Sequence, residues 1–251
     1  MDIKIPYTPR KHQAFLHNKI SKHRWSVLVC HRRFGKTVCM INHLIRSALL
    51  SKNKNPRYAY ISPTFKQSKS IAWDYMKQFT AKIPYTKFNE TELRVDLPNG
   101  ARITLLGSEN SDGLRGIYLD GCVIDEYANV NEKLFPEIIR PALSDRKGYC
   151  VFIGTPQGMN NNFYELYQHA QGAEDWFNYK AKASDTKIVD EDELVKAKEV
   201  MGEKKYLQEF ECDWIANIEG SIYSDTLVKM EDKKQLTRVP YDPSLPVNTS
   251  W

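Results

Sequence analysis

The chain has 251 residues, 41% of them hydrophobic and 27% charged, with a formal net charge of +5. This composition is typical of a soluble globular protein with one large core, or with one domain and a small annex. No apolar run approaches the length of a membrane span, and residues 1–6 lack the pattern of a signal peptide. The mild positive charge permits nucleic-acid binding without arguing for it.

The chain has five cysteines, an odd number. Cys30, Cys39, Cys122 and Cys150 lie in apolar patterns, so we expect buried thiols in a reducing compartment rather than disulfides. No pair has the spacing of metal ligands, so the sequence does not predict a zinc site.

The first expected helix starts near Pro9, which suits a first helical turn, with Thr8 as its N-cap. Arg10 and Gln13 lie in this segment, ahead of the loop described next. Guanidinium and amide groups at such a place can hydrogen-bond the edge of an adenine base. An ordinary solvated amphipathic helix is the alternative, and it stays open for Arg10 in particular.

Residues 25–37 form the segment around which the chain is organised. An apolar run of strand length leads into a loop with Arg33, Phe34, Gly35, Lys36 and Thr37, and a helical pattern follows. A strand that leads into Gly-Lys-Thr at a helix N-terminus is typical of a phosphate-binding loop. Its backbone N–H groups surround phosphates, the lysine pairs with the outer ones, and the threonine hydroxyl is placed to bind Mg²⁺. One departure from the usual pattern is Cys30, which stands where the first glycine is expected.

The next segments predict a strand at 57–62 and a helix at 65–82. Lys66, Gln67 and Lys69 at the start of that helix are candidates for DNA phosphate contacts, although solvated charge is the alternative for each. The pair Asn99-Gly100 between two alternating apolar stretches predicts a β-hairpin over 93–106. A loop over 107–120 then carries Arg115, a candidate because loops position functional groups.

A second decisive segment is residues 121–126, a short apolar strand that ends in Asp125 and Glu126. Downstream of a phosphate-binding loop this is the Walker B pattern. It predicts that Asp125 holds Mg²⁺ and that Glu126 orients and deprotonates the attacking water.

The strand predicted at 149–153 ends in Gly154 and Thr155, at the edge of the sheet where α/β folds bind ligands. Polar groups there can sense a γ-phosphate. Further on we expect a helix at 160–170, a strand at 176–182, a helix capped by Asp190 and ended by Gly202, and a helix at 203–214. From Tyr223 the sequence becomes polar and proline-rich, as in a linker.

Taken in order, these motifs resemble the ATPase region of the large terminase subunits of tailed bacteriophages. The motifs are Arg-Lys-His-Gln at 10–13, Cys-His-Arg-Arg-Phe-Gly-Lys-Thr at 30–37, Tyr-Ile-Ser-Pro-Thr at 60–64, Leu-Arg-Gly at 114–116, Val-Ile-Asp-Glu at 123–126 and Gly-Thr-Pro at 154–156. The resemblance covers about residues 7–220. The missing first glycine is expected in this family.

The resemblance implies a P-loop NTPase fold of the ASCE (RecA-like) type. This is an α/β fold with a mostly parallel twisted sheet, helices on both faces, an antiparallel hairpin insert and a small helical lid at 183–220. It also implies an ATP- and Mg²⁺-dependent motor that drives double-stranded DNA into a procapsid. The partners would be the portal protein, the small terminase subunit and further copies in a ring of usually five, although the free chain can be a monomer. The place of action would be the host cytoplasm, at the portal.

The resemblance also assigns roles to single residues. Arg32 is similar to the loop arginine that lies against the phosphates within one subunit, although its neighbour Arg33 leaves open which of the two faces inward. Arg115 resembles the arginine finger offered to the ATP of a neighbouring subunit, which can be worth roughly 10³–10⁵ in rate. Thr155, with Gly154, falls in the motif that couples γ-phosphate loss to movement.

For domain organisation we expect an ATPase domain at 1–220 and a linker at 221–251 toward a carboxy-terminal nuclease, as in the family's longer proteins. Asp225, Glu231, Asp232 and Asp242 cannot form a two-metal site by themselves, so we do not expect nuclease activity from this chain.

Two alternatives stay open at this point. One is another ASCE-type nucleic-acid helicase or translocase, although a two-domain helicase needs more sequence after residue 220. The other is a protein that uses ATP only as a structural ligand, which would leave Glu126 and Arg115 without a task.

Overall fold

The computed structural model describes residues 5–109 and 114–215, together with Met230 and Gln235. Two compact units divide the chain, Met1–Asn217 and Ile218–Trp251. Apart from Met230 and Gln235, the expected linker lies outside the described residues, and so do its four acidic residues. Among the described helices, none is long and apolar enough to cross a membrane.

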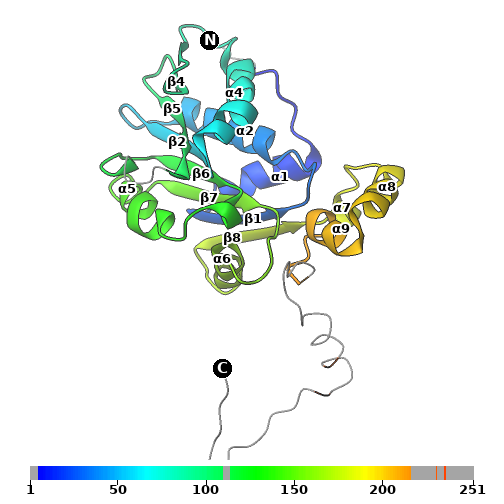
Figure 1. Cartoon of the computed structure of the whole chain (residues 1–251). Helices are drawn as coiled ribbons and strands as arrows, with labels where there is room; N and C mark the ends of the chain where they lie inside the picture. The colour runs from blue at the N-terminus through cyan, green and yellow to red at the C-terminus, as the bar shows by residue number, and fades with distance from the viewer. Residues whose placement is uncertain (1–4, 110–113, 216–229, 231–234, 236–251) are drawn as a thin grey trace, which may run out of the picture. The chain divides into compact units, whose positions relative to one another are not determined.

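An eight-stranded sheet forms the centre of the first unit, in the order β3-β4-β5-β2-β6-β7-β1-β8 (Figure 1). In this spatial order, β5, β2, β6, β7, β1 and β8 pair in parallel with their neighbours. At the other end of the sheet, β4 pairs antiparallel with both β3 and β5. The strand bounds are β1 Trp25–Cys30, β2 Arg57–Ser62, β3 Lys87–Asn89, β4 Arg94–Asp96, β5 Arg102–Gly107, β6 Gly121–Asp125, β7 Tyr149–Gly154 and β8 Trp176–Ala181. The predicted mostly parallel α/β sheet with a hairpin insert is confirmed.

Helices cover both faces of this sheet. The α-helices of the described chain are α1 Lys11–Ile20, α2 Lys36–Leu50, α3 Phe65–Gln67, α4 Trp73–Thr80, α5 Arg140–Ala142, α6 Asn162–Gln171, α7 Ala183–Thr186, α8 Glu191–Met201 and α9 Glu203–Phe210, of which α7, α8 and α9 lie beside the sheet (Figure 1). Shorter π and 3₁₀ segments are η1 Ser68–Ala72, η3 Tyr127–Asn129 and η4 Leu134–Ile139.

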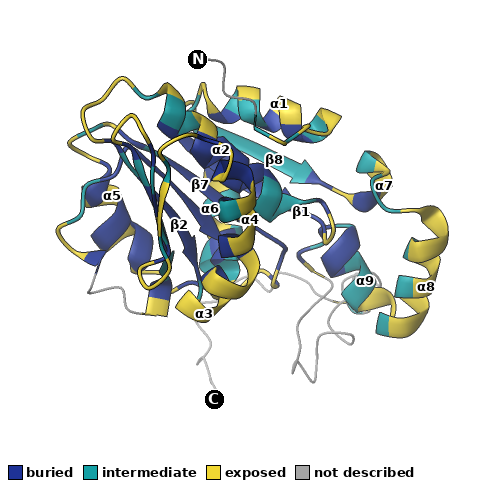
Figure 2. Cartoon of the chain, turned by 90° about the horizontal axis from the view of Figure 1, so that it is seen from above, coloured by how far each residue is buried: buried dark blue, intermediate teal, exposed yellow. Residues whose placement is uncertain are grey.

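The alternation of side chains along the strands divides the core into two layers. In β1, Leu28 and Cys30 pack with α1, α2 and α4, whereas Val27 and Val29 pack on the other face with η4 and α6. All six residues of β1 are buried, as expected for a central parallel strand covered on both faces. Figure 2 shows the dark, buried strands between helices whose outer sides are exposed.

Three boundaries differ from the sequence predictions. The first helix begins at Lys11 with Arg10 as N-cap, so the prediction of a Thr8 cap and a Pro9 first turn is wrong. In place of one helix at 65–82, α3, η1 and α4 follow one another, with a π segment between the α-helical parts. The helix predicted over 203–214 ends at Phe210, and the short edge strand β3 had no sequence prediction.

Cys30, Cys39, Cys122 and Cys150 are buried free thiols, as predicted, and so is Cys212, for which there was no prediction. Burial raises the pKa of Cys39 to about 12, so this thiol stays protonated at neutral pH.

Candidate functional site

The loop between β1 and α2 contains two residues with a left-handed backbone conformation, Gly35 and Arg33. Gly35 is the N-cap of α2 and has φ +87°, a left-handed conformation that favours glycine. Arg33 is also left-handed, with φ +70°. Phe34 between them is fully buried, which anchors the loop in the core. The N-terminus of α2, with its free N–H groups, therefore faces the carboxyl edge of the sheet.

The residues of the two nucleotide motifs meet at this edge. Lys36 begins α2, and its Nζ lies 3.6 Å from Glu126 Oε1 and 3.5 Å from the Cys30 carbonyl oxygen. Glu126 follows β6 directly and has φ +47°. A side chain other than glycine rarely adopts this conformation unless its surroundings hold it there. Strand β7 lies between β1 and β6, and because all three are parallel their carboxyl ends share one edge.

Asp125 is the buried acid of this cluster. Its Oδ1 accepts a hydrogen bond from the Glu126 backbone N–H at 2.9 Å, and its Oδ2 accepts a short one from the Tyr60 hydroxyl. Tyr60 comes from the neighbouring strand β2 and is almost fully buried. Burial and the neighbouring Asp125 raise the pKa of Tyr60 well above its ordinary value. A hydrogen bond between the Thr37 side chain and the same hydroxyl opposes this rise. The Tyr60 hydroxyl thus interacts with both expected Mg²⁺ ligands.

The pKa shifts show how strongly these groups interact. Burial lowers the pKa of Lys36, but the carboxylates of Glu126 and Asp125 raise it by more, so the ammonium form is favoured. Burial raises the pKa of Asp125 above its ordinary value, although Lys36 and the Tyr60 hydroxyl oppose this. Burial and the neighbouring Asp125 raise the pKa of Glu126, which is the direction that suits a general base.

Arg10 and Gln13 lie against the phosphate-binding loop. Gln13 is buried and donates from Nε2 to the Gly35 carbonyl oxygen at 3.3 Å, while its Oε1 accepts from the Arg10 backbone N–H at 3.0 Å. Arg10 Nη1 donates to the Phe34 carbonyl oxygen at 3.5 Å. A Cβ at Gly35 would come within 2.9 Å of Gln13 Nε2, so the end of the Gln13 side chain packs directly against this glycine.

Gly154 and Thr155 lie at the carboxyl end of β7, next to Glu126. A Cβ at Gly154 would lie 3.5 Å from Glu126 Cα, and Thr155 is buried. The following residue, Pro156, accepts a 2.6 Å hydrogen bond at its carbonyl oxygen from Gln208 Nε2 of α9. The segment is thus tied both to the Walker B acid and to the helices of the expected lid.

The two loop arginines have different surroundings. Arg32 donates its backbone N–H to the Glu209 carbonyl oxygen at 2.7 Å, and its guanidinium lies 3.8 Å from the Glu209 carboxylate. Arg33 is exposed. Glu209 and Gln208 had no sequence prediction, because no motif marks them.

Arg115 lies on another part of the molecule's surface. Its Nη2 is 3.8 Å from Glu137 Oε2 on η4, and 57% of its side chain is exposed. Solvent exposure is what a group offered to another subunit requires.

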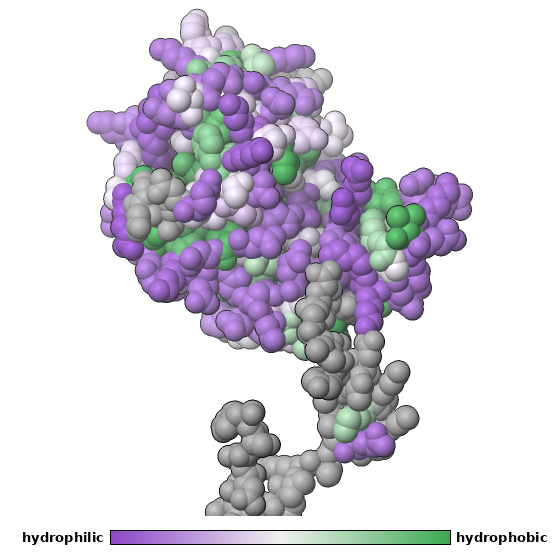
Figure 3. Space-filling view, viewed as in Figure 1, coloured by the Kyte–Doolittle hydropathy of each residue, from purple (hydrophilic) through white to green (hydrophobic). Residues whose placement is uncertain are grey.

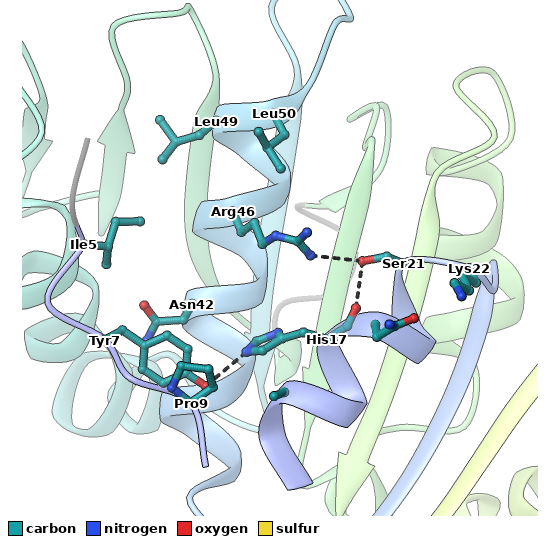
Figure 4. A pocket seen from close by; sticks show the side chains of 12 residues that line it. Ile5, Tyr7, Pro9, His17, Ser21, Lys22, Asn42, Arg46, Leu49 and Leu50 are labelled. Atoms are coloured by element: carbon teal, nitrogen blue, oxygen red, sulfur yellow. Dashed lines mark hydrogen bonds between the residues drawn. The ribbon is translucent and has the colours of Figure 1, made fainter. Parts of the chain in front are cut away.

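A hollow of about 720 Å³ lies between α1, α2 and the segment before α1. Figure 4 shows that Tyr7 and His17 face each other across it and that Arg46 reaches Ser21. Apolar side chains such as Leu49 and Leu50 form its other wall.

The order of the parallel strands and the loop–helix junction define this chain as a P-loop NTPase of the ASCE class. A family model described as "Terminase large subunit, T4likevirus-type, N-terminal" matches residues 29–230. The chain belongs to this family of terminase large subunits.

Known proteins agree with this assignment. The large terminase subunits of Thermus phage G20c and of Thermus virus P23-45 are each 40% identical over 60 residues, which is 24% of this chain and 12% of those proteins. The match therefore spans only a small part of their length. Among solved structures, the large terminase ATPase domain of Thermus phage P74-26 superposes with a TM-score of 0.71 at 20% identity, over 84% of this chain and 95% of that one. The large terminase of another thermophilic bacteriophage gives 0.71 at 16% identity, over 82% and 54%.

Proposed function

We propose that this chain binds ATP with Mg²⁺ and hydrolyses it. The observation that carries the proposal is the meeting of Lys36 and Glu126 at 3.6 Å, with Asp125 buried beside them, at the N-terminus of α2. A lysine, a hydroxyl and two acids at a free helix N-terminus are the groups that phosphoryl transfer to water requires. For the second of the two terminases compared by structure, solved complexes with ADP and with ATP-γ-S support nucleotide binding in this fold.

The donors fit a magnesium ion. The Asp125 carboxylate and the Thr37 hydroxyl are oxygen ligands, and Tyr60 lies beside both. Mg²⁺ prefers such oxygen ligands and takes the rest of its shell from phosphates and water. When bound, the ion neutralises charge on the β- and γ-phosphates.

Glu126 would orient and deprotonate the attacking water. In the structure Lys36 holds the Glu126 carboxylate, and the outer phosphates of ATP would compete for the same ammonium group. Binding of ATP therefore frees Glu126 for water at the moment when water is needed. The raised pKa of Glu126 makes it a stronger base than a solvated glutamate.

The other predicted residues fit around this centre. Arg33, Phe34, Gly35 and Lys36 would supply loop contacts to the phosphates, Arg10 and Gln13 would contact the adenine, and Gly154 and Thr155 would respond to loss of the γ-phosphate. Arg32 would act within its own subunit and Arg115 on the ATP of a neighbour. Their positions on the phosphate-binding loop, on α1, after β7 and on the exposed surface support these roles.

We further propose that hydrolysis drives double-stranded DNA into a procapsid, with this chain in a ring, usually of five, on the portal protein and with the small terminase subunit as a partner. The place of action would be the host cytoplasm. Membership of the terminase family supports this proposal. Residues 1–220 would be the ATPase domain, with the lid at 183–220, and 221–251 would lead toward a nuclease domain.

A binding and turnover experiment tests the ATPase proposal. Lys36→Ala removes the ammonium group from both the phosphates and Glu126, so we expect ATP affinity to fall by about tenfold or more and phosphate release to stop. Lys22→Ala, a change at an exposed lysine on another segment, is the matched control and should leave both unchanged. Equal ATP affinity and turnover in Lys36→Ala and the wild type would contradict the proposal.

A further inference from the structure

The helix α9 touches two loops of the nucleotide site at once. Gln208 Nε2 donates to the Pro156 carbonyl oxygen at 2.6 Å, and Glu209 Oε2 lies 3.8 Å from Arg32 Nη1. These neighbouring residues of one helix therefore contact the segment after β7 and the phosphate-binding loop. The two loops belong to strands β7 and β1, which pair directly in the sheet.

Both side chains are fixed by further contacts. Lys205, one turn earlier on α9, lies 3.4 Å from the other Glu209 oxygen and donates to Gln208 Oε1 at 3.1 Å. Gln208 is fully buried and Glu209 is 9% exposed. Buried polar side chains whose partners are all present hold a single arrangement, because any other leaves groups unsatisfied.

The lid is also docked on the phosphate-binding loop by contacts that do not involve these two side chains. The Arg32 backbone N–H donates to the Glu209 carbonyl oxygen, and His31 Nε2 lies 2.8 Å from the Thr186 hydroxyl of α7. His31 is fully buried. Because these contacts use the backbone of α9 and the side chain of Thr186 in α7, they do not depend on the side chains of residues 208 and 209. We therefore expect a change of either side chain to act on the loops rather than on docking.

We propose that Glu209 and Gln208 are positioning residues that hold the Arg32 guanidinium and the Gly154–Gln157 segment in one fixed relation. The inference rests on the proposed function, since Arg32 acts on phosphates only if the site binds ATP. The Arg32 side chain is 60% exposed even with the Glu209 carboxylate 3.8 Å from its guanidinium, so Glu209 orients this group without covering it. The phosphates of ATP would compete with Glu209 for Arg32, so the contact between α9 and the phosphate-binding loop would depend on whether ATP is bound.

A double-mutant cycle tests the Glu209 part. We expect Glu209→Gln and Arg32→Gln each to lower kcat by about tenfold while KM changes less than about threefold, and the double variant to be no slower than Arg32→Gln. If Glu209 acted only through packing, the double variant would be slower than Arg32→Gln by the same factor by which Glu209→Gln is slower than the wild type. Glu211→Gln is the matched control, because Glu211 contacts Ser184 of α7 at 2.6 Å and not the phosphate-binding loop.

Hydrogen exchange without nucleotide tests the Gln208 part. Gln208→Met keeps length and volume but removes the donor to Pro156, so we expect faster amide exchange in the peptide covering 154–158, and no change there in Glu211→Gln. Unchanged exchange in Gln208→Met, or multiplicative losses in the kinetic cycle, would overturn the inference. Absence of ATP turnover in the wild-type chain would overturn the proposed function instead, and the exchange measurement would still decide on Gln208.

Discussion

The hydroxyl of Tyr60 is a site contact whose partner, Asp125, the sequence motifs do not specify. Asp125 is buried, and its Oδ2 accepts from Tyr60. A hydrogen bond to a charged group contributes roughly 1.5–3 kcal/mol, whereas one between neutral groups contributes about 1. Tyr60 should therefore matter more for stability than a tyrosine that contacts only backbone.

Tyr58 on the same strand provides the comparison, since its hydroxyl donates to the Ser47 carbonyl oxygen at 3.1 Å. We expect Tyr60→Phe to lower the free energy of unfolding by about 2 kcal/mol and Tyr58→Phe by about 1 kcal/mol. Urea denaturation of both variants measures the difference. A smaller loss in Tyr60→Phe than in Tyr58→Phe would show that Asp125 does not depend on this hydroxyl.

Site residues can be predicted from the sequence where a motif assigns them a role, and not where it assigns none. Lys36 and Asp125 are found because a strand that runs into a short loop constrains which residue types can follow. Tyr60 begins the Tyr-Ile-Ser-Pro-Thr motif, but it lies 65 residues from its partner Asp125 and the motif assigns its hydroxyl no partner. Glu209 likewise lies in a polar helix far from Arg32 in sequence. Only the pairing of the strands and the docking of α9 bring these residues to the site.

Among the elements, α1 and α2 are joined by a pair of histidines, the half-buried His17 and the buried His43. His17 Nδ1 lies 3.2 Å from His43 Nδ1 with the rings stacked, and Tyr7 lies 3.0 Å from His17 Nε2. Burial, with the nearby Arg46 cation, lowers the pKa of His17 to about 4, and burial, with His17 and Arg46, lowers the pKa of His43 to about 3. Both rings are therefore neutral in the folded protein near neutral pH.

This pair makes stability depend on pH. An unfolded histidine has a pKa of about 6.5, so the unfolded chain binds more protons than the folded one between about pH 6.5 and pH 4. The free energy of unfolding is then unaffected by this pair above pH 6.5 and falls as the pH drops through that window. In His43→Gln, the slope of the free energy of unfolding against pH should be smaller by up to about 1.4 kcal/mol per pH unit. Denaturation curves taken across this range measure it, and an unchanged slope would count against this histidine pair.

Local sequence signals predicted some elements better than others. The Asn99-Gly100 pair placed the hairpin between β4 and β5 correctly, because such a pair favours a tight turn. The segment 65–82 looked like one helix, since its apolar spacing carries no signal for the π segment η1. The sequence does not predict the cap at Arg10, because arginine is not a usual N-cap residue; here the Gln13 side chain accepts from the Arg10 backbone N–H.

At the scale of the whole molecule, the polar surface is interrupted at the lid. Val195 and Val200 of α8 are 58% and 88% exposed. Figure 3 shows hydrophobic atoms at the right, where Figure 1 places α8, amid mostly hydrophilic surface. Exposed apolar side chains are found at contacts between proteins, so these two fit the proposed ring.

A complementation experiment tests whether Arg115 acts between subunits. Arg115→Ala should slow ATP turnover by about a hundredfold or more with little change in ATP affinity, because its task is in the transition state. Glu126→Gln should be inactive because it lacks the carboxylate that deprotonates the attacking water. If the finger is supplied in trans, a mixture of the two variants regains activity, since Glu126→Gln subunits still offer Arg115 to intact sites. A mixture no more active than the sum of its parts would contradict an intersubunit finger.

The proposed motor depends on one pocket that splits ATP. The most direct measurement compares Mg²⁺-ATP binding and phosphate release in the wild type, in Glu126→Gln and in Glu132→Gln, a change at an exposed glutamate nearby. We predict that all three bind ATP, that the wild type and Glu132→Gln release phosphate at the same rate, and that Glu126→Gln releases none. Phosphate release by Glu126→Gln at the wild-type rate would contradict the central claim.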